Sequence, residues 1–281
     1  MGELRGLIVL DYAINGRKSA HRVLQAFDLH LIPYFSRPSP RKFSQRVMSY
    51  IVSRRNQGAA AATIRYELAA LRRGYALAHR AGRIEVRPYI PTVRVSNART
   101  GFFEDMQVEA IIAALPDPID DMVRFAAITG WRVSEVMGLT WQQVDRAAGT
   151  VRLEVGSTKN GDGRHFPYKE HPDLAHLINW RYVHRMGGFV FHRRGRPVRF
   201  FRHSWLSACA HAGVSGRVFH DLRRTAVRNM ERASVPRSVQ LKLVGLRTES
   251  IHRRYSIVNE SDLKRGVRLL AGRRNGRDPK S

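Results

Sequence analysis

The sequence is poor in cysteine, in acidic residues and in long apolar runs. Its single cysteine, Cys209, excludes an internal disulfide, and the small-residue stretch ACAHAG around it indicates a buried helix position rather than a nucleophile. No run approaches the apolar length that a membrane-spanning helix needs. The short apolar patch near the N-terminus is interrupted by charge and precedes no signal-cleavage site. We therefore expect a soluble, cytoplasmic protein without membrane contact.

Because acidic residues are few, the chain is strongly basic. It has 49 Lys and Arg against 23 Asp and Glu, a formal net charge of +26, and most of the cations are arginine. Because such an excess destabilises a compact state by self-repulsion, it favours a polyanionic partner, first of all nucleic acid. A generic basic surface and binding to anionic lipid are the alternatives, and no basic amphipathic membrane helix supports the second. The 43% of hydrophobic residues argue against disorder.

The length of 281 residues favours two domains. In the first hundred residues, apolar periodicity predicts helices at 19–31, 41–55 and 59–82, the last ending near Gly82. Residues 86–101 contain two prolines and no helical period, so we predict a linker there.

The second half is also expected to be mainly helical. Helices are predicted at about 105–115 and 119–129, with a break at Gly130, and helices dominate again after Pro172 apart from a short FVFH stretch. A β-hairpin is predicted in the middle of this half. Apolar and polar residues alternate in TVRLEV, NGDG supplies a turn, and RHFPY forms the second strand. The fold class is thus mainly α with a small β-hairpin or sheet (α+β).

Polar side chains able to do phosphate chemistry occur in separate segments, each with an ordinary alternative. In TGWRVSEVMGLTW, Arg132 begins a short helix, where a guanidinium suits a phosphate oxyanion or an ion pair with Glu135. In STKNGDGR, Lys159 at the hairpin tip is either a proton donor or a solvated turn residue.

Two later segments add a histidine, an arginine and a tyrosine. In HDLRRTAVRNM, His220 and Arg223 lie one helical turn apart on one face, suited to proton transfer and anion binding or to capping and a salt bridge. In GLRTESIHRRYSIVNESDL, Tyr255 follows two arginines and is either a core aromatic or a covalent nucleophile.

The order of these segments resembles the tyrosine recombinase (phage integrase) family over almost the whole chain. ARTGFFE, at 98–104, resembles the entry to the catalytic domain, followed by the first arginine box, the lysine hairpin, the H-x-x-R box and the nucleophile segment RRYSIVNESDL. The resemblance implies a short N-terminal segment at 1–14, a helical SAM-like core-binding domain at 15–97, a catalytic domain at 98–272 and a basic, disordered tail at 273–281. No arm-binding domain is expected before residue 15.

The resemblance also implies roles. Tyr255 would attack the scissile phosphate and form a 3′-phosphotyrosyl bond, while Arg132 and Arg223 stabilise the charge that develops in the transition state. Lys159 would protonate the departing 5′-oxygen and His220 would assist proton transfer. Neither a metal nor another cofactor is needed. The expected partner is double-stranded DNA, bound by a homotetramer on two DNA sites. The expected location is the cytoplasm, in association with the nucleoid, for a protein that is encoded by a bacterium or a phage and that integrates or excises a mobile element.

One position departs from the family pattern. Gly245-Leu246 stands where the family has Gly-His, or sometimes Gly-Trp, and leucine cannot donate the usual hydrogen bond to phosphate. This predicts a rate lowered on the order of 10²-fold, unless another group such as His252 compensates. The leucine also leaves an alternative open, in which the chain is a DNA-binding protein that has lost catalytic activity. A type IB topoisomerase is the other alternative. The candidate DNA contacts are Arg65, Arg72, Arg73, Arg164 and Arg224, with further arginines around 193–202.

Overall fold

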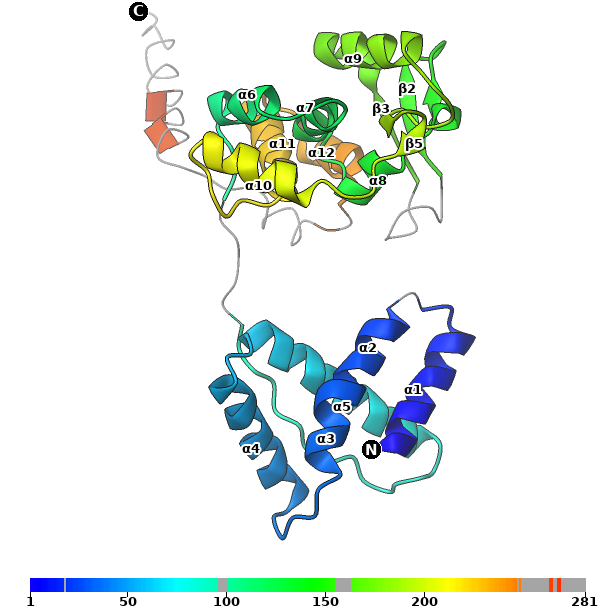
Figure 1. Cartoon of the computed structure of the whole chain (residues 1–281), viewed down its shortest axis with the longest axis vertical. Coiled ribbons are helices and arrows are strands. Elements are labelled where there is room, and N and C mark those ends of the chain that lie inside the picture. Colours follow the sequence, from blue (N-terminus) through cyan, green and yellow to red (C-terminus); the bar gives the residue numbers. More distant parts are fainter. Residues whose placement is uncertain are drawn as a thin grey trace, which may run out of the picture. The chain divides into compact units, whose positions relative to one another are not determined.

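The computed structural model describes residues 1–17, 19–95, 101–154, 163–246, 248, 263–264 and 267–268. The chain divides into two compact units, Met1–Asn97 and Ala98–Ser281 (Figure 1). Among the described residues, every helix is too short or too polar to cross a bilayer.

The first unit is all-helical. The helices predicted from periodicity are confirmed, and the one expected at 19–31 continues through a π-helical turn into a further helix. The elements are α1 (Gly2–Ile14), α2 (Ala20–Ala26), η1 (Phe27–Leu31), α3 (Ile32–Phe35), α4 (Phe43–Asn56) and α5 (Ala61–Arg80). Helix α5 has an apolar stripe that includes the buried residues Ile64, Leu68 and Leu71, and Gly82 follows its end with a positive φ of 65°.

Helix α1 was not expected from the sequence, which suggested only a short segment at 1–14. It packs against α5 through Leu4 and Ile8, which are buried one turn apart. Leu10 and Ile14 of the same helix are exposed. The apolar residues therefore do not gather on one face, and this is why periodicity did not indicate a helix.

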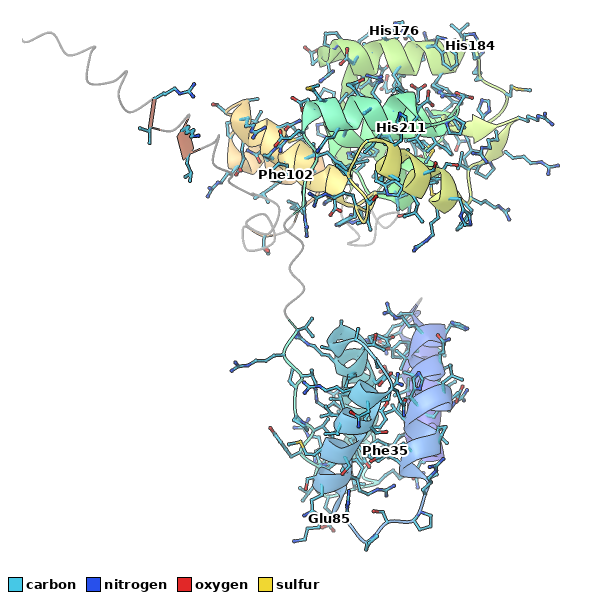
Figure 2. All side chains as sticks on the ribbon, turned by 60° about the vertical axis from the view of Figure 1, so that its left-hand side comes forward. Phe35, Glu85, Phe102, His176, His184 and His211 are labelled. Atoms are coloured by element: carbon cyan, nitrogen blue, oxygen red, sulfur yellow. The ribbon has the colours of Figure 1, made fainter. Side chains whose placement is uncertain are left out.

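A buried carboxylate joins α4 to α5. Glu67 is 1% exposed and accepts hydrogen bonds from the Tyr50 hydroxyl at 2.7 Å and from Nη2 of Arg54 at 2.8 Å. Burial and the neighbouring Glu67 carboxylate raise the pKa of Tyr50. Figure 2 shows Phe35 among these helices and Glu85 at the edge of the unit.

The predicted linker at 86–101 is partly packed onto the first unit. Its described part, up to residue 95, has no helix or strand, as expected. However, Ile90 and Val93 are buried in the core of the unit. Arg72 donates hydrogen bonds to the Pro91 carbonyl at 3.3 Å and to the Thr92 hydroxyl at 3.2 Å.

The second unit confirms a mainly α fold with small antiparallel sheets. Strand β2 pairs with β1 on one side and β3 on the other, with Val151 opposite Phe166. Residues 155–162, which contain the first three residues of the predicted NGDG turn, lie outside the described residues. The elements are α6 (Asp105–Ala113), α7 (Ile119–Thr129), α8 (Val133–Met137), η2 (Trp141–Gln143), β1 (Val144–Asp145), β2 (Thr150–Leu153), β3 (Arg164–Pro167), η3 (Tyr168–Glu170), α9 (Pro172–Val183), β4 (His192–Arg193), β5 (Arg196–Pro197), α10 (Arg202–His211), α11 (Asp221–Arg232) and α12 (Arg237–Val244).

The core of this unit places α11 at its centre. Figure 1 shows α6, α7 and α10 around α11 and α12, and α11 packs against both α7 and α12. Aromatic rings fill the interior, with Phe125 5.5 Å from Trp131 and 5.7 Å from Phe191. Cys209 of α10 is buried, as expected, and burial raises the pKa of its thiol to about 11.

Candidate active site

The turn between α7 and α8 presents Arg132. Gly130 ends α7 with a left-handed φ of 66°, and a side chain there would approach Ala226 to 3.1 Å and Val244 to 3.2 Å. A glycine is therefore required both by the backbone conformation and by the close packing of α11 and α12. Arg132 follows two residues later as the residue that begins α8.

Glu135 holds Arg132 in place. Its carboxylate accepts hydrogen bonds from the backbone N–H of Arg132 and from Nη1 of the same residue, both at 2.7 Å. The ion pair that the sequence offered as the ordinary alternative is thus present. It does not remove Arg132 from the site, because the charge of Arg132 is close enough to His220 to lower the pKa of that imidazole.

The buried side chain of Arg223 connects two backbone segments of the site. The residue is 2% exposed, and its guanidinium donates to the Gly130 carbonyl at 2.8 Å and to the Gly245 carbonyl at 3.1 Å. These two acceptors belong to the α7–α8 turn and to the end of α12. One guanidinium on α11 therefore fixes the positions of both neighbouring backbone segments.

His220 immediately precedes α11, one turn before Arg223. It is an exposed residue, although neighbouring protein atoms crowd its ring. This crowding lowers the pKa of His220, and the positive charges of Arg223, Arg224 and Arg132 lower it further, against the opposing effect of Asp221. The imidazole is therefore neutral at neutral pH and able to accept a proton.

Arg164 has a different place from the one expected. We predicted a DNA contact, but its side chain is only 5% exposed and pairs with the Glu135 carboxylate. It also donates a hydrogen bond to the Val244 carbonyl and lies 4.9 Å from the centre of the Trp131 ring. Arg164 is therefore part of the buried framework of the unit, and its contact with DNA stays a prediction.

Glu135 is thus shared by two arginines. Burial alone would raise its pKa, but the positive charge of Arg164 and the hydrogen bonds from Arg132 outweigh burial, so the pKa of Glu135 lies below its usual range. The carboxylate stays ionised and holds both guanidinium groups. The sequence indicated Glu135 only as a partner of Arg132, from the spacing of three residues, because Arg164 lies 29 positions further along the chain.

Leu246 lies in an apolar cluster. The residue is 8% exposed and packs with Val227 and Val244, and the partly buried Met230 and Leu241 extend the cluster. Its backbone N–H donates to the Leu241 carbonyl at 2.9 Å. The leucine at the altered family position therefore has a packing role in this chain.

The remaining arginine candidates differ in their accessibility. Arg65 is exposed on α5, whereas Arg72 and Arg73 are partly buried, and Arg73 pairs with Asp11 at 2.6 Å. The side chain of Arg224 is 12% exposed, with Nη1 3.6 Å from an oxygen of Asp221. Arg65 is consequently the most accessible of these candidates.

Lys159 and Tyr255 lie outside the described residues, as does His252. Their roles remain predictions. Within the described ranges, no group of three or more His, Cys, Asp and Glu side chains has an arrangement that could hold a metal ion.

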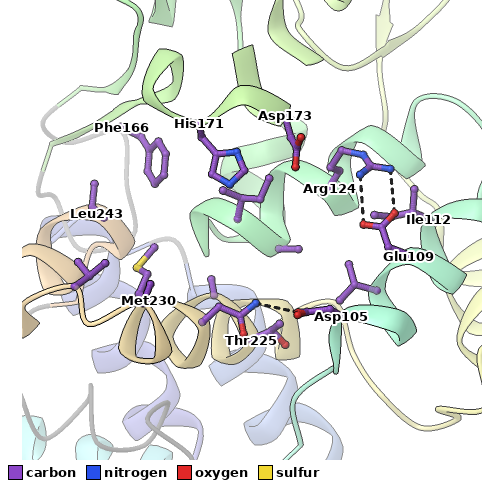
Figure 3. Close-up of a pocket in the computed structure, with 17 residues that line it drawn as sticks. Asp105, Glu109, Ile112, Arg124, Phe166, His171, Asp173, Thr225, Met230 and Leu243 are labelled. Atoms are coloured by element: carbon purple, nitrogen blue, oxygen red, sulfur yellow. Dashed lines mark hydrogen bonds and ion pairs between the residues drawn. The ribbon is translucent and has the colours of Figure 1, made fainter. Parts of the chain in front are cut away.

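A pocket of about 530 Å³ lies on another side of α11. It is bounded by α6, α7 and the β3–α9 segment, with Ile112, Phe166 and Met230 among its apolar walls (Figure 3). Asp105, Glu109 and Asp173 place acidic groups at this pocket, where they would repel phosphate. Neither His220 nor the candidate catalytic arginines line it, so we place the candidate active site at the other face of the helix.

The fold and the convergence of Arg132, His220 and Arg223 define a protein of the tyrosine recombinase class. The model of the phage integrase family matches residues 102–261, which is more than half of the chain. The chain belongs to this family.

Individual relatives agree with this assignment. The integrase of Salmonella phage P22 is 24% identical over 194 residues, which cover 65% of this chain, and the chain spans about half the length of that relative. In fold, the chain is similar to a lambda integrase dimer bound to a COC′ core site, with a TM-score of 0.72 and 15% identity over 88% of this chain and 96% of that one. The chain is also similar in fold to the Tn1549 transposon integrase in complex with a circular intermediate DNA. The TM-score is 0.70 and the sequence identity 12%, over 95% of this chain and 99% of that one.

The pKa of His220 provides a direct test of the cation cluster. In the DNA-free protein, an NMR titration should give His220 a pKa below the ordinary value of about 6.5. Arg224→Gln should raise this pKa, because it removes one neighbouring positive charge. Arg193→Gln, at an exposed arginine of the β4–β5 hairpin, serves as the control and should leave it unchanged. A His220 pKa at or above 6.5 would contradict the crowding of this imidazole by Arg223, Arg224 and Arg132.

The buried Arg164–Glu135 pair should contribute more to the free energy of unfolding than an exposed ion pair on the sheet that contains Arg164. Arg164→Met is expected to lower the free energy of unfolding by about 3 kcal/mol, because Glu135 then keeps a buried charge with one partner fewer. Arg152→Met removes the Arg152–Asp145 pair, whose side chains are 55% and 38% exposed, and should cost less than about 1 kcal/mol. Chemical unfolding of both variants measures the difference, and equal costs would rule out the framework role of Arg164.

Proposed function

We propose that this chain is a site-specific DNA recombinase that cuts and rejoins strands through a 3′-phosphotyrosyl intermediate. The observation that supports it most is the convergence of Arg132 with His220 and Arg223, which belong to one segment about 90 positions further along the chain. Such a set can bind one phosphate group and handle one proton beside it, and family membership supports Tyr255 as the nucleophile.

The proposed chemistry assigns one task to each group. The phenol oxygen of Tyr255 attacks the scissile phosphorus and displaces the 5′-oxygen of the next nucleotide, so one phosphodiester bond is exchanged for another. Arg132 and Arg223 stabilise the negative charge that develops on the non-bridging oxygens. His220 assists proton transfer from the phenol, and Lys159 protonates the departing 5′-oxygen. Because the ester bond is conserved, a 5′-hydroxyl can reverse the reaction on another duplex.

The proposed partner is double-stranded DNA. The net charge of +26 supports this, as do relatives solved on DNA, including a lambda integrase tetramer bound to a Holliday junction. By the same analogy we propose a homotetramer on two DNA sites. Since the relatives are a phage and a transposon integrase, we propose integration or excision of a mobile element as the biological role, at the nucleoid of a bacterial cell.

A DNA-binding protein without catalysis is the second candidate. It is favoured by one observation, the packing of Leu246 in an apolar cluster at the position where the family usually has a phosphate-binding side chain. The candidate catalytic residues Arg132, His220 and Arg223 favour the enzyme, because a purely architectural protein has no need of a neutral imidazole between arginines.

Covalent trapping tests the proposal. With a nicked suicide substrate that contains its recombination site, the protein should form a covalent protein–DNA adduct, because the short fragment that carries the released 5′-hydroxyl diffuses away before religation. Tyr255→Phe should abolish the adduct, and Arg223→Gln should reduce it on the order of 10²-fold. The adduct is measured by denaturing gel electrophoresis.

The controls separate the alternatives. Tyr12→Phe, on a partly buried tyrosine of the first unit, should leave the adduct unchanged. Specific DNA binding without any adduct would favour the architectural protein. Adducts on any duplex, together with relaxation of supercoiled plasmid, would favour a type IB topoisomerase activity.

Substituting the family histidine at position 246 should not speed up the reaction. Leu246→His replaces a buried apolar side chain by an imidazole, which should lower the midpoint of thermal unfolding, since a buried polar group costs about 1–3 kcal/mol. We expect no gain in the rate of adduct formation, with Leu246→Met as the size-matched control. A faster reaction at unchanged stability would instead mean that the leucine limits catalysis.

A further inference from the structure

Helix α9 has an exposed apolar surface at the edge of the second unit (Figure 1). On its inner side the helix buries Leu174 and Leu177. On its outer side and just beyond its end, three large apolar side chains are exposed: Trp180 at 42%, Val183 at 73% and Met186 at 62%. Tryptophan and methionine are enriched in protein–protein interfaces, so such a cluster indicates a surface that a partner covers.

The ring of Trp180 is held in one orientation. It stacks on the ring of His184, with centres 4.3 Å apart and planes at 27°, and the guanidinium of Arg181 lies 4.9 Å from its centre. Figure 2 shows His184 on α9, and Nδ1 of this histidine lies 2.9 Å from the Trp180 carbonyl oxygen. An aromatic side chain that is already ordered loses little conformational entropy when it is covered. Trp180 is therefore suited to the centre of an interface.

The N-terminal part of α9 borders an acidic hollow of about 340 Å³. Besides Trp180, the hollow is lined by the four carboxylates of Asp117, Asp120, Asp121 and Asp173. Arg181 pairs with three of these, and the lining Arg124 is paired with Glu109 at 3.3 Å. Burial raises the pKa of Asp121, and the charge of Asp120 raises it further, against the effect of Arg181. The hollow thus has an excess of negative charge in a chain whose net charge is +26.

The C-terminal end of α9 is basic. The exposed Arg185 lies 3.9 Å from the centre of the Tyr182 ring and donates from Nη1 to the Tyr182 carbonyl at 2.7 Å. Arg146 lies 3.7 Å from the centre of the same ring. The guanidinium of Arg185 is thus held in position, and it has further N–H groups that can donate to a carboxylate.

These observations describe one surface with an acidic end, an apolar middle and a basic end. We call it the α9 face, which consists of Asp173, His176, Asn179, Trp180, Val183, Arg185 and Met186. We propose that the α9 face binds the α9 face of a second copy of this chain, with the two helices antiparallel about a two-fold axis at Asn179. Asn179 lies midway in sequence between Asp173 and Arg185. Arg185 of each copy therefore meets the acidic hollow at Asp173 of the other, and both Trp180 rings are covered between the two ion pairs.

Charge complementarity selects a second copy as the occupant. A surface that is acidic at one end and basic at the other is complementary to itself when it is reversed, which is the condition for a two-fold symmetric interface. Over the rest of their surfaces, two chains of charge +26 repel each other. The helix has 12 residues and is about 18 Å long, so the contact belongs to the weak class, with a Kd on the order of 10–100 μM. The inference goes beyond the proposed function and does not depend on it, because no candidate catalytic residue belongs to the α9 face.

Sedimentation equilibrium of the full chain without DNA tests the proposal. The parent protein should show a monomer–dimer equilibrium between about 5 and 500 μM. Trp180→Ala should raise the Kd at least about tenfold, because the ring is lost from both copies. Tyr89→Ala removes an aromatic ring of the first unit that is 74% exposed, and as the matched control it should leave the Kd unchanged. A parent protein that stays monomeric at the highest concentration overturns the proposal.

Charge reversal tests the antiparallel geometry. Asp173→Arg and Arg185→Asp should each raise the Kd at least about tenfold, because like charges then meet at both ends of the interface. An equimolar mixture of these two variants should dimerise again, because opposite charges meet at both ends of the mixed pair. Arg65→Asp changes the net charge as Arg185→Asp does, at an exposed position of α5, and should have no such effect. Unchanged association of the single variants, or no recovery in the mixture, shows that the proposal is wrong. Adduct formation on DNA is measured separately and decides the proposed function in either case.

Discussion

The carboxylate of Glu135 is the interaction on which the candidate site depends. Arginine side chains from the α7–α8 turn and from β3 approach each other inside a chain that already carries a net charge of +26. Without a negative charge between them, Arg132 and Arg164 would repel each other in a poorly hydrated place. Glu135 accepts hydrogen bonds from both, and its lowered pKa keeps it ionised. The positively charged site can therefore exist without a bound anion.

The backbone at the end of α12 is the second element of this arrangement. Carbonyl groups of Val244 and Gly245 accept hydrogen bonds from Arg164 and Arg223, and the Leu243 carbonyl accepts one from the Trp131 indole at 3.3 Å. Guanidinium groups thus serve as structural donors on one side of the site, where they cap a helix end. The same bonds hold the start of the segment that leads to Tyr255. Directly after these carbonyl groups, Leu246 packs with Val227 and Val244 in an apolar cluster.

The large positive charge is only partly available to a polyanion. Arg54 is bound to Glu67 and Arg73 to Asp11, while Arg181 pairs with Asp121 at 2.7 Å in a nearly buried position. These arginines stabilise the two units from within. Exposed arginines such as Arg65, Arg199 and Arg202 are the ones left to set the potential at the surface. Net charge alone therefore indicates the kind of partner but not the contact residues.

The sequence by itself determined the fold class, the main helices and the family, because hydrophobic periodicity and the order of short motifs are local properties. For the same reason it offered Arg132, His220 and Arg223 as candidate site residues, whose roles stay predictions. Only the tertiary structure decided that Arg164 turns inward to Glu135, that Leu246 joins an apolar cluster, and that α1 packs on α5. Each of these depends on which residues meet after folding. A guanidinium 29 positions from its carboxylate leaves no pattern along the chain, because the two residues become neighbours only after folding.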